Sequence, residues 1–344
     1  MSIFSLPFSN STELAVAYRV YFVVSISGAC LGFVGASFFL YQVRSEETTS
    51  TRRRMLTLLG LSDLLADMGV IVKSVYWLIA PASVGPPFAV ETGATVLECW
   101  VLFWYLSTFF STFFYVADIY NSSHCGQWRS CYSCGLTWLF CLLFASLAAL
   151  VVWTGDSSPL RRARQSVWAD GSYKEDSSSV IAYLSCFYGS LVVLLVSLPF
   201  FFISVLRQDN LKRSITSGVK ADELAQAHQQ MISTVLSFYF SWTLSGLDGI
   251  MLIIAHLEFS AHPSLIKAIF DAKYIYIIWL LEGLLNPLQS LLRVSLYHCM
   301  VRLGQLRHMV RDRRTLSTSG ECISVDFRHG RGNVKHVYTD KPFN

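Results

Sequence analysis

The residues of this sequence that are most able to do chemistry are acids placed inside long apolar runs. Asp63, Asp248 and Glu282 each lie in such a run, and Asn286-Pro287 follows Glu282 by about one helical turn. An ionisable group at the middle of a membrane costs on the order of 2.5–3.5 kcal/mol even on lenient insertion scales, so these acids are expected to face the interior of a bundle. Proline removes a backbone hydrogen bond, and an acid on a facing helix, such as Asp63, could hold the water that satisfies the freed carbonyl. The five residues are predicted to form a polar switch or ion site; the alternative is protonated acids that only hydrogen-bond neighbouring helices.

Two further charged residues, Lys73 and Glu98, each lie nearer to the end of an apolar run. Lys73 comes ten residues after Asp63, which is about 15 Å along a helix, and Glu98 occupies a comparable level of the next run. Lys73 would therefore reach the mouth of a helix bundle. The alternative is an interfacial lysine whose stem lies along apolar surface while its ammonium reaches water.

Seven stretches with few charges must position these side chains. The 344-residue chain is 53% hydrophobic and 15% charged, against about 45–50% and about 25% in an ordinary soluble protein. A helix needs about 20 apolar residues to cross a membrane, and the period-two alternation of a barrel strand is missing from these stretches. They run over Val16–Val43, Met55–Ile79, Ala94–Ile119, Tyr132–Val152, Val180–Leu206, Met231–Leu257 and Ile266–Leu296. The sequence predicts an all-α fold, a seven-transmembrane helical bundle over residues 16–296.

The positions of Lys and Arg predict which side of the membrane each end faces. Arg44 and Arg52 follow the first span, Arg129 follows the third, and Arg302 begins a series of arginines after the seventh, whereas residues 1–18 contain no Lys or Arg. Short loops rich in these residues stay in the cytoplasm. Residues 1–15 are therefore expected on the extracellular or lumenal side, where Asn10 of Asn10-Ser11-Thr12 could be glycosylated.

The chain after the last span divides into two segments. Residues 297–314 place apolar side chains among arginines, which is typical of an amphipathic helix on the cytoplasmic leaflet, and Cys299 is available for acylation. Residues 315–344 are polar without apolar periodicity and are expected to be a disordered cytoplasmic tail. The cysteines at 125, 131 and 134 lack a standard zinc spacing, so no metal and no cofactor are expected.

Local patterns in three of the predicted spans agree in residue type and spacing with those of a known family. They are Asp63-Leu64-Leu65, Gly69, Lys73-Ser74 and Trp77-Leu78 in the second span, Trp100 and Ala117-Asp118-Ile119-Tyr120 in the third, and Trp279, Gly283, Leu285-Asn286-Pro287 and Gln289 in the seventh. The chain resembles the ocular albinism type 1 receptors, an atypical family of G-protein-coupled receptors. It departs from the wider class at Ile119, where rhodopsin-like receptors usually carry arginine.

The resemblance implies a receptor for a small ligand related to tyrosine or dihydroxyphenylalanine. It also implies signalling to heterotrimeric G proteins, arrestin as a further partner, and residence in the plasma membrane or in melanosomes or late endosomes. An amino-acid-like ligand would place its carboxylate on Lys73 and its ammonium on Glu98, with Trp77, Trp100 and Trp242 as aromatic walls. The surface expected to meet the G protein and anionic lipids contains Asp118, Tyr120, Arg129, Lys212, Arg213 and Arg302.

Other functions compete with this interpretation. A transporter or a proton pathway could use the membrane acids as a relay, although the spans do not divide into inverted repeats. A buried retinal site is disfavoured because Lys273 lies 13 residues before Asn286, about 19 Å away by helical rise. Hydrolase, metalloprotease and phosphate-loop motifs are missing, so neither an enzyme nor a nucleic-acid partner is expected.

The first testable prediction is the topology, because the basic loops place the N-terminus outside. We expect an epitope at residue 5 to be labelled on intact cells and one at residue 340 only after permeabilisation. For a protein of internal organelles, protease added to intact vesicles should cleave the tail and spare the N-terminus. Reversed access would rule out the predicted bundle.

Overall fold

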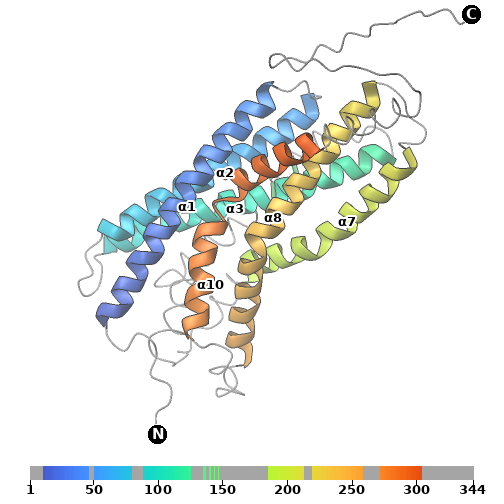
Figure 1. The fold of residues 1–344 in the computed structure, drawn as a ribbon. Helices are drawn as coiled ribbons and strands as arrows, with labels where there is room; N and C mark the ends of the chain where they lie inside the picture. Colours follow the sequence, from blue (N-terminus) through green and yellow to red (C-terminus); the bar gives the residue numbers. More distant parts are fainter. Residues whose placement is uncertain are drawn as a thin grey trace, which may run out of the picture. The chain divides into compact units, whose positions relative to one another are not determined.

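The computed structural model describes residues 11–45, 50–79, 88–124, 185–212, 219–258 and 272–303, and single residues between 135 and 146. Apart from a turn at residues 286–288, the six continuous segments are helical. The elements are α1 (Ser11–Ser45), α2 (Ser50–Ile79), α3 (Phe88–His124), the π-helical η2 (Ser185–Gly189), α7 (Ser190–Lys212), α8 (Val219–Glu258) and α10 (Ala272–Leu285). They run side by side as a bundle (Figure 1), and residues 289–303 form one more helix.

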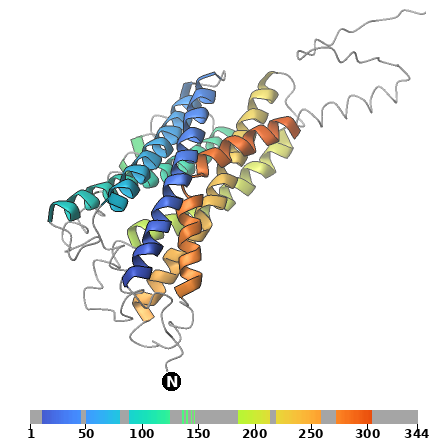
Figure 2. The same cartoon turned by 60° about the vertical axis from the view of Figure 1, so that its left-hand side comes forward.

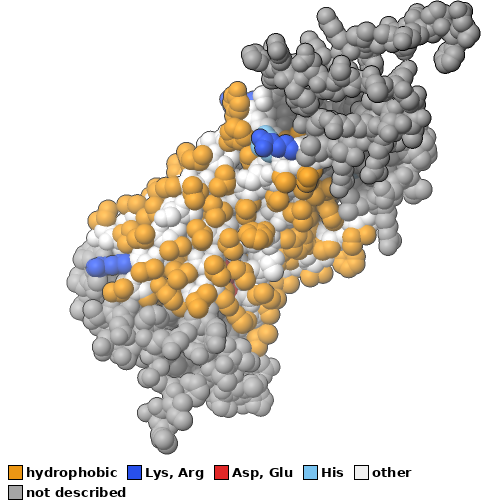
Figure 3. All heavy atoms as spheres, viewed as in Figure 1, with side chains coloured by type: hydrophobic (Ala, Val, Ile, Leu, Met, Phe, Trp, Pro, Cys, Tyr) orange, Lys and Arg blue, Asp and Glu red, His pale blue; other side chains and the backbone are white. Residues whose placement is uncertain are grey.

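The bundle exposes apolar side chains and buries many polar ones beside its hydrophobic core. Val34, Val193 and Phe200 are largely exposed, whereas Ser62, Ser111 and other small polar residues are fully buried. Hydrophobic side chains cover the described part of the face in Figure 3. A soluble protein does not expose apolar surface so continuously, so this distribution is that of a multi-pass membrane protein.

Four helices of the described segments are long and apolar enough to cross a membrane: Val16–Ser45, Arg52–Ile79, Val96–Ile119 and Phe187–Ser204. They coincide with the predicted first, second, third and fifth spans. The predicted sixth span lies in α8, whose buried face carries Ser233, Thr234, Ser237, Ser241 and Asp248. Most of the predicted fourth span lies outside the described residues, so the full set of seven crossings stays a prediction.

The predicted seventh span is divided in two. α10 ends at Leu285, residues 286–288 form a turn, and a helix resumes at residue 289. Proline has no backbone N–H and cannot continue the helical ladder. Before the turn Asn286 N donates to Glu282 O (3.1 Å), and after it Leu292 N donates to Leu288 O (3.0 Å). The stretch Ile266–Leu296 is therefore not one continuous helix, and its residues 266–271 lie outside the described part of the chain.

Helix α1 lies beside this divided span in both views of the fold (Figures 1 and 2). Its Gly28, Gly32 and Gly35 face the backbone of Leu284, Pro287 and Leu291, respectively. A Cβ atom at Gly28 would lie 2.8 Å from Leu284 O, and one at Gly35 would lie 2.5 Å from Leu291 N. Because these residues have no side chain, the two helices approach closely, and α1 covers backbone that the turn has interrupted.

The second prediction concerns this contact. Gly32→Ala should destabilise the protein by about 1–3 kcal/mol, because the new methyl group would collide with the carbonyl of Pro287, which is backbone and cannot move aside. Thermal unfolding in detergent would measure the change. Gly189→Ala is the matched control, since a Cβ there meets nothing within 4 Å. Equal stability of both variants would contradict the proposed packing.

Candidate functional site

A cavity of about 120 Å³ lies between α1, α2, α3, η2, α8 and α10. We call it the pocket. Its walls include the aromatic side chains Tyr21, Phe22, Tyr105, Tyr188 and Trp242. A buried cavity of about 150 Å³ binds benzene, so the pocket, which is somewhat smaller, has the size for a ligand of no more than about one ring.

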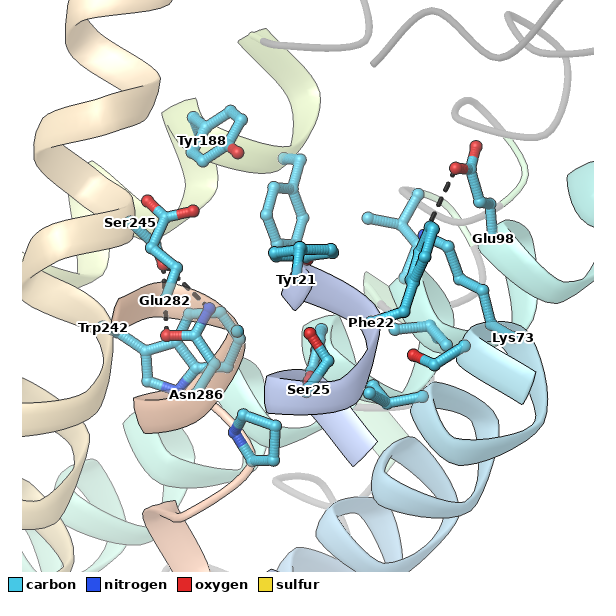
Figure 4. A pocket seen from close by; sticks show the side chains of 18 residues that line it. Tyr21, Phe22, Ser25, Lys73, Glu98, Tyr188, Trp242, Ser245, Glu282 and Asn286 are labelled. Atoms are coloured by element: carbon cyan, nitrogen blue, oxygen red, sulfur yellow. Dashed lines mark hydrogen bonds and ion pairs between the residues drawn. The ribbon is translucent and has the colours of Figure 1, made fainter. Parts of the chain in front are cut away.

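Lys73 of α2 and Glu98 of α3 lie at one side of the pocket (Figure 4). Lys73 Nζ is 3.2 Å from a carboxylate oxygen of Glu98, and the two side chains are 23% and 12% exposed. The structure thus brings together the cation and the anion that the sequence assigned to opposite ends of a ligand. They form an ion pair with each other.

The opposite side of the pocket is formed by α8 and α10. Glu282 is 4% exposed, and it lies near Asn286 and Trp242 in Figure 4. Asn286 and Ser245 are hydrogen-bonded through their side chains, with Asn286 Nδ2 2.8 Å from Ser245 Oγ. Trp242 donates its indole N–H to Gln289 Oε1. The pocket wall is thereby connected to both sides of the turn at residues 286–288.

Two tryptophans expected in the pocket lie elsewhere. Trp100 is 40% exposed, and its Nε1 donates to Leu65 O (3.0 Å). Trp77 stacks on Phe22, with ring centroids 6.4 Å apart. Neither lines the pocket, whereas Trp242 does. The sequence did not single out Tyr21, Phe22 or Tyr105, because an aromatic residue in an apolar run gives no sign of which neighbour it faces.

Asp63 lies at the centre of a buried polar cluster, which we call the Asp63 network. Its Oδ1 accepts a hydrogen bond from Thr108 of α3 (2.7 Å), and its Oδ2 accepts one from Ser290. Arg293 Nη1 is 2.8 Å from Asp63 Oδ2 in an ion pair whose members are 1% and 6% exposed. The arginine also lies over the ring of Phe39, 4.9 Å from its centroid. The network ties α2 and α3 to the helix that follows the turn.

Arg293 was not among the site residues predicted from the sequence, although an arginine six residues after the predicted break was a visible signal. A buried arginine is costly unless an anion compensates it, so its presence inside the seventh span called for a partner such as Asp63. Asp67, 2% exposed and one turn after Asp63, was missed as well.

The Asp63 network is not fully hydrogen-bonded. Arg293 Nε and Nη2 and Asp67 Oδ2 are buried, and none has a hydrogen-bond partner among the residues that the structure describes. Each unsatisfied buried group typically costs about 1–3 kcal/mol, and more when it is charged. The low dielectric that strengthens the hydrogen bonds of such a cluster also makes its unpaired groups costly.

The remaining predicted residues are dispersed. Asp248 is buried on α8. Asp118 is partly buried and interacts electrostatically with Arg52. Arg302 and Cys299 are exposed. The predictions for Asn10, Arg129 and Arg213, and for the side chains of Tyr120 and Lys212, lie outside what the structure describes. Within the described segments, His, Cys, Asp and Glu nowhere gather in a group of three that could hold a metal ion.

Comparison of the sequence with known proteins does not assign this chain to a family. No family model matches this chain, and no curated protein matches it. The solved structure of squid rhodopsin is similar to it, with 11% sequence identity over 80% of this chain and 81% of that chain and a TM-score of 0.49. The resemblance to ocular albinism type 1 receptors stays a resemblance of motifs.

The third prediction tests the buried ion pair. Arg293→Met should lower the free energy of unfolding by about 3–5 kcal/mol, because Asp63 is left as an uncompensated buried charge. Thermal unfolding in detergent would measure it, with Arg302→Met on the exposed side of the same helix as the control. The double variant Asp63→Leu/Arg293→Met should regain most of the loss, since no unpaired charge is left behind. A double variant as unstable as the single one would contradict this account.

Proposed function

We propose that this protein is a receptor of the G-protein-coupled type that binds a small ligand related to tyrosine or dihydroxyphenylalanine. The ligand would occupy the pocket, and the signal would pass to a heterotrimeric G protein on the cytoplasmic side, with arrestin as a further partner. The proposal assigns the protein to the plasma membrane or to melanosomes or late endosomes, and it includes no catalytic step.

One observation carries the proposal: Asn286 and Pro287 line the pocket and also interrupt the helix. A ligand that contacts the pocket wall therefore acts on the point where the chain can bend. Ser290 and Arg293, within two turns after this point, bind Asp63. A change at the pocket can thus alter the contacts of the helix that leads to the predicted cytoplasmic side, which is the requirement for a two-state switch.

The proposed coupling surface includes residues near the ends of described helices. Asp118 lies near the end of α3, and Arg302 lies on the helix after the turn. Rhodopsin-like receptors usually carry an arginine next to this acid, where this chain has Ile119. Here Arg52, near the beginning of α2, supplies a positive charge near Asp118 instead. Together with Tyr120, Arg129, Lys212 and Arg213, these residues would contact the G protein and anionic lipid headgroups.

A proton or ion pathway is the second candidate. It is favoured by the buried acids Asp63, Asp67 and Glu282 and by the hydrogen-bonding groups of Arg293 and Asp67 that have no partner among the described residues. Such groups could pass protons along a chain of waters. The receptor is preferred because the pocket, the turn and the Asp63 network are connected through Asn286, Gln289 and Ser290.

The fourth prediction tests signalling. Asp63→Asn alone, and Asp63→Asn combined with Arg293→Gln, should each lower G-protein coupling by about tenfold, which lies within the usual range for coupling between two sites. The reason is that the helix after the turn would no longer move with α2 and α3. Sensors of G-protein dissociation, covering each class of heterotrimer, would measure coupling at matched surface expression. Val193→Ala, at an exposed position of α7 outside the network, is the control.

Two results would contradict the receptor. The first is normal coupling in a well-expressed Asp63→Asn variant, which would make Asp63 a packing residue. The second is the lack of coupling to every G protein and to arrestin, combined with an Asp63-dependent proton flux in liposomes. That combination would establish the pathway instead.

A further inference from the structure

We infer that the pocket takes an uncharged aromatic ring with one hydroxyl group, a phenol, and that Ser25 is its hydrogen-bonding partner. This inference rests on the pocket being the ligand site of the proposed function, and it names the part of the ligand that enters. For a ligand related to tyrosine, that part is the phenol ring, and the charged end stays on the side of Lys73 and Glu98, which are partly exposed.

The hydroxyl group of Ser25 is the observation that leads to a phenol. Ser25 lies on α1, lines the pocket and is 2% exposed, and its Oγ has no hydrogen-bond partner in the described part of the chain. Serine hydroxyls inside helices commonly donate to the carbonyl one turn earlier, as Ser27 of the same helix does to Val23 O (2.9 Å). Ser25 therefore offers both a donor and an acceptor to a ligand. A ligand group that pairs with this hydroxyl is favoured, because leaving it buried and unpaired is costly.

Space for such a group lies beside Ser25 on the α10 side. Gly283 lines the pocket too, and a Cβ atom there would lie 2.6 Å from Ser25 Oγ. Because glycine has no side chain, that position stays open. In Figure 4, Ser25 lies between Glu282 on one side of the pocket and Lys73 on the other.

The rest of the pocket suits one aromatic ring. Tyr21 and Phe22 of α1 and Trp242 of α8 line it, and aromatic side chains pack favourably against a ring. The cavity of about 120 Å³ is somewhat smaller than the cavity of about 150 Å³ that binds benzene. About one ring is therefore the most that it takes, and a hydroxyl group is among the smallest substituents that a ring can carry.

The charges that line the pocket disfavour a charged group inside it. Lys73, Glu98 and Glu282 are the acids and bases among its lining residues, tyrosines aside. Lys73 and Glu98 pair with each other at 3.2 Å, and Glu282 has its own interaction inside the protein. A charged ligand group would have to disrupt one of these contacts or lie in the pocket unpaired, and both are costly. A neutral hydroxyl group requires neither.

Four probes that share a fluorinated ring separate these cases. 4-Fluorophenol carries the hydroxyl, fluorobenzene lacks it, 4-fluorobenzylamine is a cation and 4-fluorobenzoate is an anion. Binding to the purified full-length protein in nanodiscs of zwitterionic lipid would be measured by fluorine NMR titration, with the signal of empty nanodiscs subtracted. 4-Fluorophenol should bind at least about fivefold more tightly than each of the other three, a difference of the size that one hydrogen bond supplies.

The variant Ser25→Ala removes the hydroxyl group and keeps the helix. It should weaken 4-fluorophenol by at least about fivefold and leave fluorobenzene within about twofold. Ser27→Ala is the matched control and should leave both affinities unchanged, because this exposed serine of the same helix lies outside the pocket. Since Ser25 Oγ has no partner among the described residues, Ser25→Ala should not lower the unfolding temperature measured without ligand. That measurement separates a loss of binding from a loss of structure.

Several results would overturn the inference. An equal effect of Ser25→Ala on 4-fluorophenol and fluorobenzene, including no effect on either, would show that the hydroxyl group does not contact the ligand. In the unchanged protein, binding of fluorobenzene or of a charged probe as tightly as 4-fluorophenol would overturn it without any variant. Binding of none of the four probes would do so as well.

The assay needs no G protein, so the two proposals can fail separately. Binding of 4-fluorophenol that depends on Ser25, without coupling to any G protein, would leave the inference standing and refute the receptor. Coupling driven by a ligand that Ser25→Ala binds with unchanged affinity would do the reverse.

Discussion

The ion pair between Asp63 and Arg293 is the interaction on which the arrangement of the bundle depends. Both side chains are almost completely buried, and each would be a costly isolated charge without the other. Because Thr108 and Ser290 bind the same carboxylate, α2, α3 and the helix after the turn meet at a single group. None of the three can slide far along another without separating opposite charges in a medium with little water.

In the proposed receptor, the turn at residues 286–288 would give this arrangement its capacity to change. It interrupts the backbone ladder within the bundle, where unsatisfied carbonyl groups are expensive. The glycines of α1 let a neighbouring helix cover that backbone closely, and the pocket lies directly against the same residues. The seventh predicted span thus lines the pocket, contains the turn and carries Arg293 of the buried ion pair. The proposed binding and signalling steps would therefore both involve this short segment.

The sequence predicted those features that depend on one helix at a time. The apolar runs and the interruption at Pro287 are local patterns. Contacts between helices also depend on how each helix is rotated about its own axis. The sequence does not give this rotation, so fewer of these contacts were predicted. Trp100 follows Glu98 by two residues, about 200° around a helix, and the structure places it on another face of α3. The pairings of Lys73 with Glu98 and of Asp63 with Arg293 could not be derived, because no single-chain pattern encodes the register between helices.

The two ion pairs of the bundle differ in how far water reaches them, and this has a consequence for the medium around the protein. Lys73 and Glu98 are partly exposed, so dissolved ions can approach them, and the screening length at physiological ionic strength is only about 8 Å. Asp63 and Arg293 are out of reach of such ions. Dissolved salt therefore weakens the pair that lines the pocket and spares the inner one. In the proposed receptor, the ionic strength of the medium would therefore act on the ligand site and leave the internal linkage of the helices unchanged.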